Sequence, residues 1–247
     1  MMLLADIGNT RVKWAQAQGR ELSGHGTALH AGLPPAGIWP KAWAGLPRPQ
    51  RIVVSNVAGA ALAQSLRVYC EQQFQLAPEF LTPSSRAVGV SNGYLDPAQL
   101  GADRWAAVVG AFSRYGGPAG VIGCGTAITV DTVNGEGRHL GGLIAPGLAV
   151  MRRALAEAAP VLPADANGDS VLFARDTRSA VSSGVLRAAA GFIERVVAEI
   201  RERQGAQVKW LLTGGDAEAL QAVLREPFTL APHLVLEGLA VLAEARP

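Results

Sequence analysis

Two stretches of this sequence share one pattern, and that pattern constrains the fold more than any other feature. LLADIGNTRVKWAQ (3–16) and GVIGCGTAITVDTV (120–133) each run from an apolar strand through a small Gly-containing turn into an alternating strand. Such a pattern is typical of a β-hairpin. Because each hairpin opens about half of the chain, the sequence predicts two similar α/β domains, 1–116 and 117–247, with a weak internal duplication.

The stretches that follow each hairpin alternate between strand and helix patterns, as expected for α/β domains. Gly116, Gly117 and Pro118 supply the stop signal that separates the halves. Residues 32–49 and 84–97 are rich in turn-forming or polar residues and are expected to be mainly loops. Strands are expected near 51–57, 80–83, 137–147 and 208–215, and helices at 59–74, 98–113, 147–158, 175–203, 216–224 and from about 234.

The turn of the first hairpin has two physical interpretations. Asp6, Gly8, Asn9 and Thr10 are ordinary turn residues, because Gly and Asn accept unusual backbone angles at little cost. The same turn could instead bind phosphate through its backbone N–H groups, with the carboxylate holding a hydrated Mg²⁺. The matched turn at the start of the second half favours phosphate binding, because two such turns could hold a nucleotide from both sides.

The composition predicts a folded, soluble protein without an obvious macromolecular partner. Apolar residues make up 49% and charged residues 17% of the chain, which favours a sizeable core over disorder. The net charge of +2 gives no reason to expect a nucleic acid or an anionic membrane as partner. The longest uncharged stretch, 115–130, is interrupted by Pro118 and rich in Gly, so it does not predict a membrane span.

The cysteines, the histidines and the N-terminus also agree with a soluble cytoplasmic protein. Cys70 and Cys124 lack paired metal-ligand spacing and fit a reducing, cytoplasmic compartment. The four histidines show no ligand spacing, so no zinc site is predicted. Asp6 interrupts the first apolar run and no basic segment precedes it, so the N-terminus does not resemble a signal peptide.

Six segments together resemble the type III pantothenate kinases, a family of the acetate and sugar kinase/Hsp70/actin superfamily. The resemblance implies an actin-like α/β fold of two ribonuclease H-like domains, with mixed sheets flanked by helices. It also implies ATP-dependent phosphorylation of pantothenate to 4′-phosphopantothenate, the first step of coenzyme A biosynthesis. The segments are DIGNTRVKW (6–14), YLDPAQLGADRWAAVVGA (94–111), GTAITVD (125–131), GGLIAPG (141–147), DTRSAVSSG (176–184) and LLTGGDA (211–217).

Two other functions stay open. The family includes proteins described as accessory factors of a transcriptional regulator, so a non-enzymatic accessory protein with the kinase fold is one alternative. Another small-molecule phosphotransferase of the superfamily is the other. Retention of Asp6, Thr10, Asp103 and Thr126 favours the kinase over the accessory protein, and Tyr94 with GADR (101–104) favours pantothenate as acceptor.

The resemblance assigns roles to individual residues. Asp103 would be the general base, and Asp6 would hold Mg²⁺ through water. Each functional role has a purely structural alternative. Asp103 and Arg104 could be a surface pair, Tyr94 an ordinary loop aromatic and Lys13 an outward-facing lysine. The substrate-binding residues would be Tyr94, Gly101, Ala102, Asp103, Arg104 and Thr177, and the ATP-binding residues Asp6, Ile7, Gly8, Asn9, Thr10, Arg11, Val12, Lys13 and Thr126.

One position departs from the family pattern. The resemblance implies a homodimer that needs K⁺ or NH₄⁺, which an aspartate of the second turn helps to bind. This chain has Gly123 at that position. Backbone carbonyls could still coordinate the cation, but the negative charge is missing. We therefore expect an altered dependence on the monovalent cation.

Overall fold

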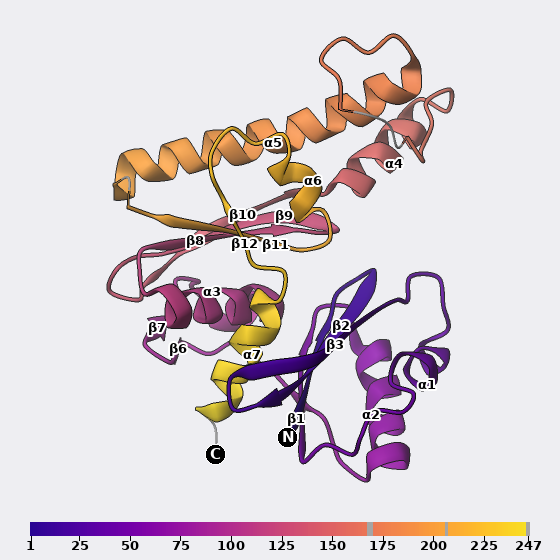
Figure 1. Cartoon of the computed structure of the whole chain (residues 1–247), viewed down its shortest axis with the longest axis vertical. Helices are drawn as coiled ribbons and strands as arrows, with labels where there is room; N and C mark the ends of the chain where they lie inside the picture. The colour runs from indigo at the N-terminus through magenta and orange to yellow at the C-terminus, as the bar shows by residue number, and fades with distance from the viewer. Residues whose placement is uncertain (167–169, 206, 246–247) are drawn as a thin grey trace. The chain divides into compact units, whose positions relative to one another are not determined.

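The computed structural model describes residues 1–166, 170–205 and 207–245. These residues form two compact units, whose elements Figure 1 labels. Unit 1 comprises Met1–Gly116, Glu136–Leu140 and the stretch from His233, and unit 2 comprises Gly117–Gly135 and Gly141–Pro232. The first change of unit along the chain lies between Gly116 and Gly117. The C-terminal helix α7 (Leu234–Glu244) belongs to unit 1, although the sequence predicts it within the second domain, 117–247.

A five-stranded sheet with the order β3-β2-β1-β4-β5 forms the centre of unit 1. Strand β1 (Met2–Ile7) pairs antiparallel with β2 (Arg11–Gln18) and parallel with β4 (Arg51–Asn56), which pairs parallel with β5 (Glu79–Phe80). These strands confirm the predicted hairpin and the buried strand near 51–57. The edge strand β3 (Glu21–Leu29) was not predicted, because its mostly exposed sequence, ELSGHGTAL, has no regular apolar alternation.

Side-chain alternation gives the two faces of this sheet different neighbours. Leu3, Ala5 and Ile7 pack in one core with α1 (Trp39–Ala42) and α2 (Ala60–Phe74). Because successive strand residues point to opposite faces, Asp6 lies on the other face. Helices α3 (Ala102–Tyr115) and α7 contact this sheet without joining the α1–α2 core. The alternation therefore directs Asp6 towards the side of the sheet where α3 and α7 pack.

Short elements fill the segments that the sequence predicts as loops. A small antiparallel hairpin joins β6 (Arg86–Ala87) and β7 (Val90–Ser91) within the region 84–97. Two short 3₁₀ helices, η1 (Pro35–Gly37) and η2 (Pro97–Gln99), precede α1 and α3. The second of them leads directly into Gly101, the residue before α3.

The sheet of unit 2 repeats the topology of the first. Its order is β10-β9-β8-β11-β12. Strand β8 pairs antiparallel with β9 and parallel with β11, and β11 pairs parallel with β12, as β1, β2, β4 and β5 do in unit 1. This topology agrees with the duplication predicted from the two hairpins. The strands are β8 (Ala119–Cys124), β9 (Ala127–Val133), β10 (His139–Pro146), β11 (Lys209–Thr213) and β12 (Thr229–Leu230).

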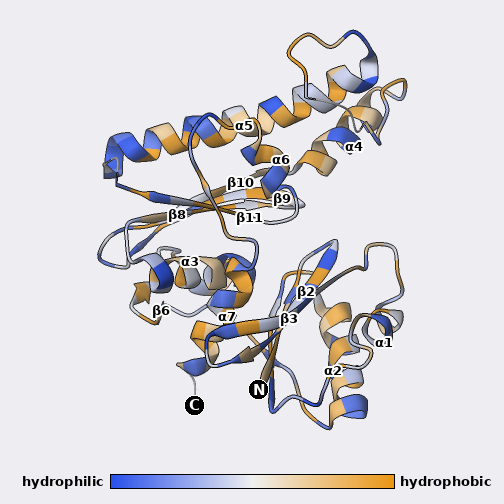
Figure 2. Ribbon diagram, in the orientation of Figure 1, coloured by the Kyte–Doolittle hydropathy of each residue, from blue (hydrophilic) through white to orange (hydrophobic). Residues whose placement is uncertain are grey.

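Three helices, α4 (Leu148–Ala158), α5 (Thr177–Gln204) and α6 (Ala217–Gln221), complete unit 2 on one side of its sheet (Figure 1). Val181, Val185, Ala189, Ile193 and Val197 recur every four residues on α5 and form the stripe that packs on the sheet. Hydrophobic and hydrophilic residues accordingly alternate along α5 in Figure 2. Among the described residues, no helix combines the length and hydropathy that crossing a bilayer requires.

Small residues allow α3 and α7 to pack closely in unit 1. A Cβ atom added at Gly238 of α7 would lie 1.8 Å from the carbonyl oxygen of Ala106 in α3. One added at Gly110 would lie 3.0 Å from the backbone of Gly238. Both distances are too short for a Cβ without displacement of backbone. The helix that carries Asp103 is therefore held by backbone-to-backbone contact.

This packing predicts that Gly238→Ala destabilises the protein. The added methyl group would force α3 and α7 apart, and we expect a loss of about 1–3 kcal/mol in the free energy of unfolding. Urea denaturation followed by circular dichroism measures it. Gly191→Ala in α5 is the matched control, because no other described segment has an atom within 4 Å of its added Cβ. The control should be neutral or stabilising by up to about 1 kcal/mol, and equal stabilities of the two variants would contradict the packing argument.

Candidate active site

The turn between β1 and β2 is narrow and is held from outside the hairpin. The N–H group of Gly8 donates to the carbonyl oxygen of Arg11 at 3.0 Å, while Asn9 and Thr10 are exposed. His30 is buried, and its Nε2 lies 2.7 Å from the carbonyl oxygen of Gly8. Because a carbonyl oxygen only accepts, Nε2 carries the proton. The backbone N–H of His30 also donates to the carbonyl oxygen of Thr10, so His30 fixes the turn at both ends.

Asp6 has one carboxylate oxygen that the protein itself does not satisfy. The residue is partly exposed, but its Oδ1 is enclosed and has no hydrogen-bond partner among the described residues. Ser55, its register partner on β4, also has an enclosed Oγ without a partner within that part of the chain. Two neighbouring buried polar atoms without partners indicate a place for water or an ion.

The environment of Asp6 disfavours its charge. Burial and the nearby charge of Asp103 raise the pKa of Asp6 to about 7, against the opposing effects of Ser55 and Lys13. Ser55 favours the ionised form without reaching hydrogen-bond geometry. Lys13 pairs in register with Asp6, and its pKa is lowered mainly by burial. Lys13 therefore shares the face of Asp6 rather than projecting freely into solvent. A cation beside Asp6 would relieve the unfavourable charge.

Asp103 lies in the first turn of α3, where a carboxylate interacts favourably with the helix dipole. Its Oδ1 accepts the backbone N–H of Arg104 at 2.8 Å. A Cβ atom at the preceding Gly101 would lie 2.6 Å from that oxygen, so any larger residue there would displace the side chain of Asp103. The effect of Asp103 on Asp6 shows that the two carboxylates are near neighbours within unit 1.

Arg104 and Tyr94 form a pair beside Asp103. The guanidinium of Arg104 donates from Nη1 to the hydroxyl oxygen of Tyr94 at 2.8 Å, and its Cζ lies 5.6 Å from the Tyr94 ring centroid. Arg104 is only 8% exposed, which contradicts the alternative of a solvated surface arginine. Tyr94 is likewise held by specific contacts and is not an ordinary loop aromatic.

The turn between β8 and β9 in unit 2 is one residue shorter than the turn between β1 and β2. The N–H group of Gly125 donates to the carbonyl oxygen of Ala127 at 3.1 Å, and the carbonyl oxygen of Thr126 accepts from Gly147 at 2.9 Å. A Cβ at Gly147 would lie 2.0 Å from the carbonyl oxygen of Gly125, and one at Gly214 would lie 2.2 Å from that of Cys124. Two glycines thus permit other segments to press against this turn.

Sheet register identifies Gly123 as the counterpart of Asp6. Asp6 pairs with Lys13 and Ser55, whereas Gly123 pairs with Thr129 and Thr213 at the corresponding positions of β9 and β11. A Cβ atom at Gly123 would lie 2.6 Å from Oγ1 of Thr129. The second turn therefore has hydroxyl groups around the position at which the first turn has a carboxylate.

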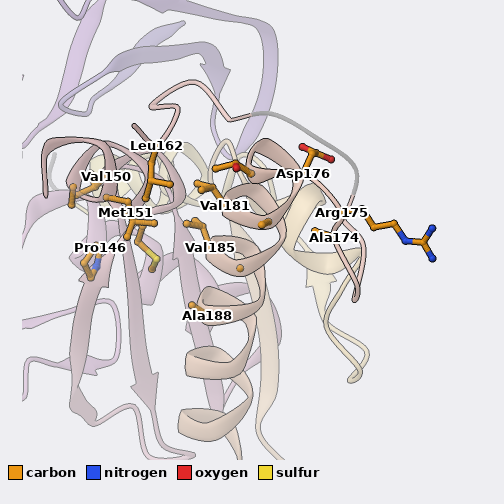
Figure 3. A pocket seen from close by; sticks show the side chains of 15 residues that line it. Pro146, Val150, Met151, Leu162, Ala174, Arg175, Asp176, Val181, Val185 and Ala188 are labelled. Atoms are coloured by element: carbon orange, nitrogen blue, oxygen red, sulfur yellow. The ribbon is translucent and has the colours of Figure 1, made fainter. Parts of the chain in front are cut away.

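Thr177 begins α5 beside an apolar pocket of unit 2. The side chain of Asp176 caps the helix by accepting the N–H of Ser179 at 2.8 Å. The pocket has a volume of about 1030 Å³ and lies between α4 and α5. Figure 3 shows Met151 and Leu162 facing Val181 of α5, with Asp176 at one end. Thr177 thus combines a helix N-terminus with a largely apolar surface.

The structure distributes the predicted residues over both units. Unit 1 brings together the turn Asp6–Lys13, Tyr94 and Gly101–Arg104, and unit 2 contains Gly123, Thr126 and Thr177. Cys124 is buried, and burial raises the pKa of its thiol to about 12. His30 and Ser55 were not predicted, because neither belongs to a recognisable motif. Only the fold brings His30 to Gly8 and Ser55 to Asp6.

Comparison with known proteins places these residues in a family. The sequence matches the family model of type III pantothenate kinase over residues 2–199. A type III pantothenate kinase from Nitrosococcus oceani is 38% identical over 99% of this chain and 94% of the relative. One from Aromatoleum aromaticum is 41% identical over 98% of each chain.

Solved structures show the same fold. A protein from Campylobacter jejuni, assigned to the Baf family of transcriptional activators, superposes with a TM-score of 0.61 at 22% identity, covering 98% of this chain and 97% of that one. A ROK family glucokinase from Streptomyces griseus has a TM-score of 0.52 at 12% identity and covers 99% of both chains. These similarities confirm the actin-like α/β fold with two mixed sheets flanked by helices. Because the family model covers most of the chain and the curated relatives align along nearly all of it, the chain belongs to the type III pantothenate kinase family.

Proposed function

We propose that this protein transfers a phosphoryl group from ATP to pantothenate, giving 4′-phosphopantothenate, the first step of coenzyme A biosynthesis. The observation that carries this proposal is the position of two carboxylates in unit 1, Asp6 beside a phosphate-type turn and Asp103 beside the Arg104–Tyr94 pair. The charge of Asp103 raises the pKa of Asp6. A carboxylate for the nucleotide's cation and another for the acceptor are what phosphoryl transfer to a hydroxyl group requires. Family membership supports the same reaction.

Asp103 acts as the general base in this proposal. As the oxygen–phosphorus bond forms, the attacking hydroxyl of pantothenate gives its proton to the carboxylate of Asp103, and ADP leaves with the original bridging oxygen. Its Oδ1 accepts the N–H of Arg104, which fixes the direction of the side chain. Asp103 is therefore oriented by its own helix before substrate binds.

The remaining substrate contacts follow from shape and charge. The planar guanidinium of Arg104 suits the carboxylate of pantothenate. Tyr94 lines the acceptor site, and Gly101 and Ala102 offer backbone at the start of α3. Thr177, at the start of α5, is proposed as a further substrate contact.

The two turns are proposed to bind ATP. Residues Asp6–Lys13 form the first phosphate loop, in which backbone N–H groups and the exposed hydroxyl of Thr10 meet phosphate oxygens. Thr126 supplies a hydroxyl from the second turn. Asp6 fits a magnesium ion bound through water, because its enclosed Oδ1 has no partner among the described residues. When bound, magnesium neutralises phosphate charge; Asp6 would hold its water shell, and Ser55 lies beside it.

Replacing the proposed base tests this mechanism. Asp103→Asn keeps the shape of the side chain but cannot accept the proton, so turnover should fall by about 100-fold or more. A coupled assay of ADP release with pantothenate measures turnover. Asp165→Asn, at an exposed carboxylate that pairs with Arg178, is the control and should retain full activity.

The same assay separates the alternative functions. Turnover of Asp103→Asn within a few-fold of the wild type would remove Asp103 from its role. ADP release with another small hydroxyl compound but not with pantothenate would favour a different phosphotransferase. Absence of ADP release with every acceptor, in a folded protein with magnesium and potassium, would favour the accessory-protein alternative.

The proposal includes an altered need for potassium or ammonium. Gly123 provides no carboxylate, and the hydroxyl of Thr129 lies beside the place where its Cβ would be. Carbonyl oxygens can coordinate potassium without supplying charge. We therefore infer that this protein needs more of the cation than relatives with aspartate, or responds to it more weakly.

Restoring the carboxylate tests the cation dependence. Gly123 is not in the left-handed region, so an aspartate is compatible with its backbone. We expect Gly123→Asp combined with Thr129→Ala, which makes room for the new side chain, to be activated at lower KCl than the wild type. Activity is titrated with KCl against NaCl at constant ionic strength, with Thr129→Ala alone as control. Wild-type saturation at low potassium, unchanged in the double variant, would contradict the inference.

A homodimer and a cytoplasmic location belong to the same proposal. Leu172 and Phe173 are 69% and 85% exposed. They immediately precede residues that line the apolar pocket between α4 and α5. A second copy of the chain could bury this exposed apolar surface. Phe173→Asp should then reduce the mass found by sedimentation equilibrium to that of a monomer, whereas Val68→Asp on α2 should leave it unchanged. Identical masses for wild type and Phe173→Asp would count against this surface. The two free cysteines fit a reducing cytoplasm.

A further inference from the structure

Tyr94 is a well-held aromatic side chain in a largely exposed part of its loop. Its neighbours Gly93, Leu95 and Asp96 are exposed. The backbone N–H of Tyr94 donates to Oδ1 of Asn92 at 3.0 Å, which holds the main chain. Its hydroxyl accepts from Arg104 at 2.8 Å. Neither contact fixes the plane of the ring.

His139, the first residue of β10, makes a ring contact with Tyr94 in addition to that of the guanidinium of Arg104, whose Cζ lies 5.6 Å from the ring centroid. Its imidazole stacks on the Tyr94 ring with centroids 6.0 Å apart and planes 15° from parallel, a favourable offset geometry. His139 is fully buried, so its own position is rigid. Its Nδ1 also accepts the N–H of Gly93 at 3.5 Å, which ties the same loop to the same imidazole.

Backbone contacts within unit 1 hold the segment that precedes His139. The N–H of Ser91 donates to the carbonyl oxygen of Gly137 at 2.8 Å, and Ser91 forms a parallel bridge with Arg138. A Cβ at Gly137 would lie 2.1 Å from the carbonyl oxygen of Gly89, so the strand segment before His139 packs directly on the β6–β7 hairpin. The position of the imidazole therefore follows from backbone contacts rather than from a flexible side chain.

We propose that His139 is a positioning residue for the binding of pantothenate. It orients the ring of Tyr94 and, through the Tyr94 hydroxyl, the guanidinium of Arg104. This role rests on the proposed function of Tyr94 and Arg104 in binding pantothenate. The guanidinium of Arg104 is planar, so the strength of its hydrogen bonds to a carboxylate depends on its orientation. The loss of the imidazole releases the Tyr94 ring and, with it, the hydroxyl that accepts from Arg104. Binding of pantothenate weakens, whereas binding of ATP does not.

A set of three variants tests the role by kinetics. His139→Leu removes the ring and should raise the KM for pantothenate about tenfold, while the KM for ATP stays within about twofold. His139→Phe keeps a flat ring for stacking and should recover a KM for pantothenate within about threefold of wild type. Leu66→Ala in α2 is the stability control, because this buried residue packs on the other face of the sheet; it should change neither KM.

A spectroscopic readout tests the positioning without any activity. The chain has three tyrosines, so tyrosine labelled with ¹³C at Cζ alone gives three carbon signals, and Tyr94→Phe identifies one of them. The Tyr94 signal should shift in His139→Leu and not in Leu66→Ala.

The outcomes separate this inference from the proposed function. An unmoved Tyr94 signal in His139→Leu would overturn the inference. Equal rises of both KM values in His139→Leu, or failure of His139→Phe to recover pantothenate binding, would also overturn it. If the wild type released no ADP with pantothenate, the proposed function would fail, and the Tyr94 signal would still decide whether His139 orients the ring.

Discussion

The proposed site depends on a carboxylate at the end of a central strand that the protein leaves partly unsatisfied. Alternation along β1 places Leu3, Ala5 and Ile7 in an apolar core and leaves Asp6 on the opposite face, where α3 and α7 contact the sheet. Burial and Asp103 disfavour its charge. Burying a charge destabilises a fold unless other groups compensate for it, and carboxylates in such surroundings cluster at functional sites. The proposed cation provides that compensation.

The two halves of the chain share a backbone plan and differ in chemistry. Asp6 and Gly123 occupy corresponding register positions in their sheets, although the turn that follows Gly123 is one residue shorter. Only the first turn has a carboxylate on the strand before it. In the second, glycines at 147 and 214 let other segments approach the backbone, and hydroxyl groups surround Gly123. Duplication therefore accounts for the architecture, and local substitution accounts for the different roles proposed for the turns.

Local signals predicted most of the fold, and long-range contacts account for what they missed. The two hairpins were recognisable because strand alternation and turn residues are properties of neighbouring positions. The mostly exposed edge strand β3 lacks alternation, and its place is set by pairing with β2. The C-terminal helix joins unit 1 because Gly238 fits against Ala106, which no local pattern shows.

The residues of the candidate site also fall into two groups, those that local motifs predict and those that only long-range contacts reveal. Asp6 and the GADR segment around Asp103 stand out as motifs, and a resemblance to a family could assign them roles. His30 and His139 are single histidines without ligand spacing, and only the fold brings them to Gly8 and Tyr94. Residues that orient other residues carry little signal in a single sequence, because their effect depends on a partner far along the chain.

The coupling of the two carboxylates is tested most directly by the titration of Asp6. Carbon-detected NMR of labelled aspartate side chains, without magnesium, gives the pKa of this carboxyl in the wild type and in Asp103→Asn. The structure predicts a pKa of about 7 in the wild type and a lower value in the variant, since burial remains but the neighbouring charge is removed. A pKa near the usual 3.8 that does not change in Asp103→Asn would contradict the proposed site.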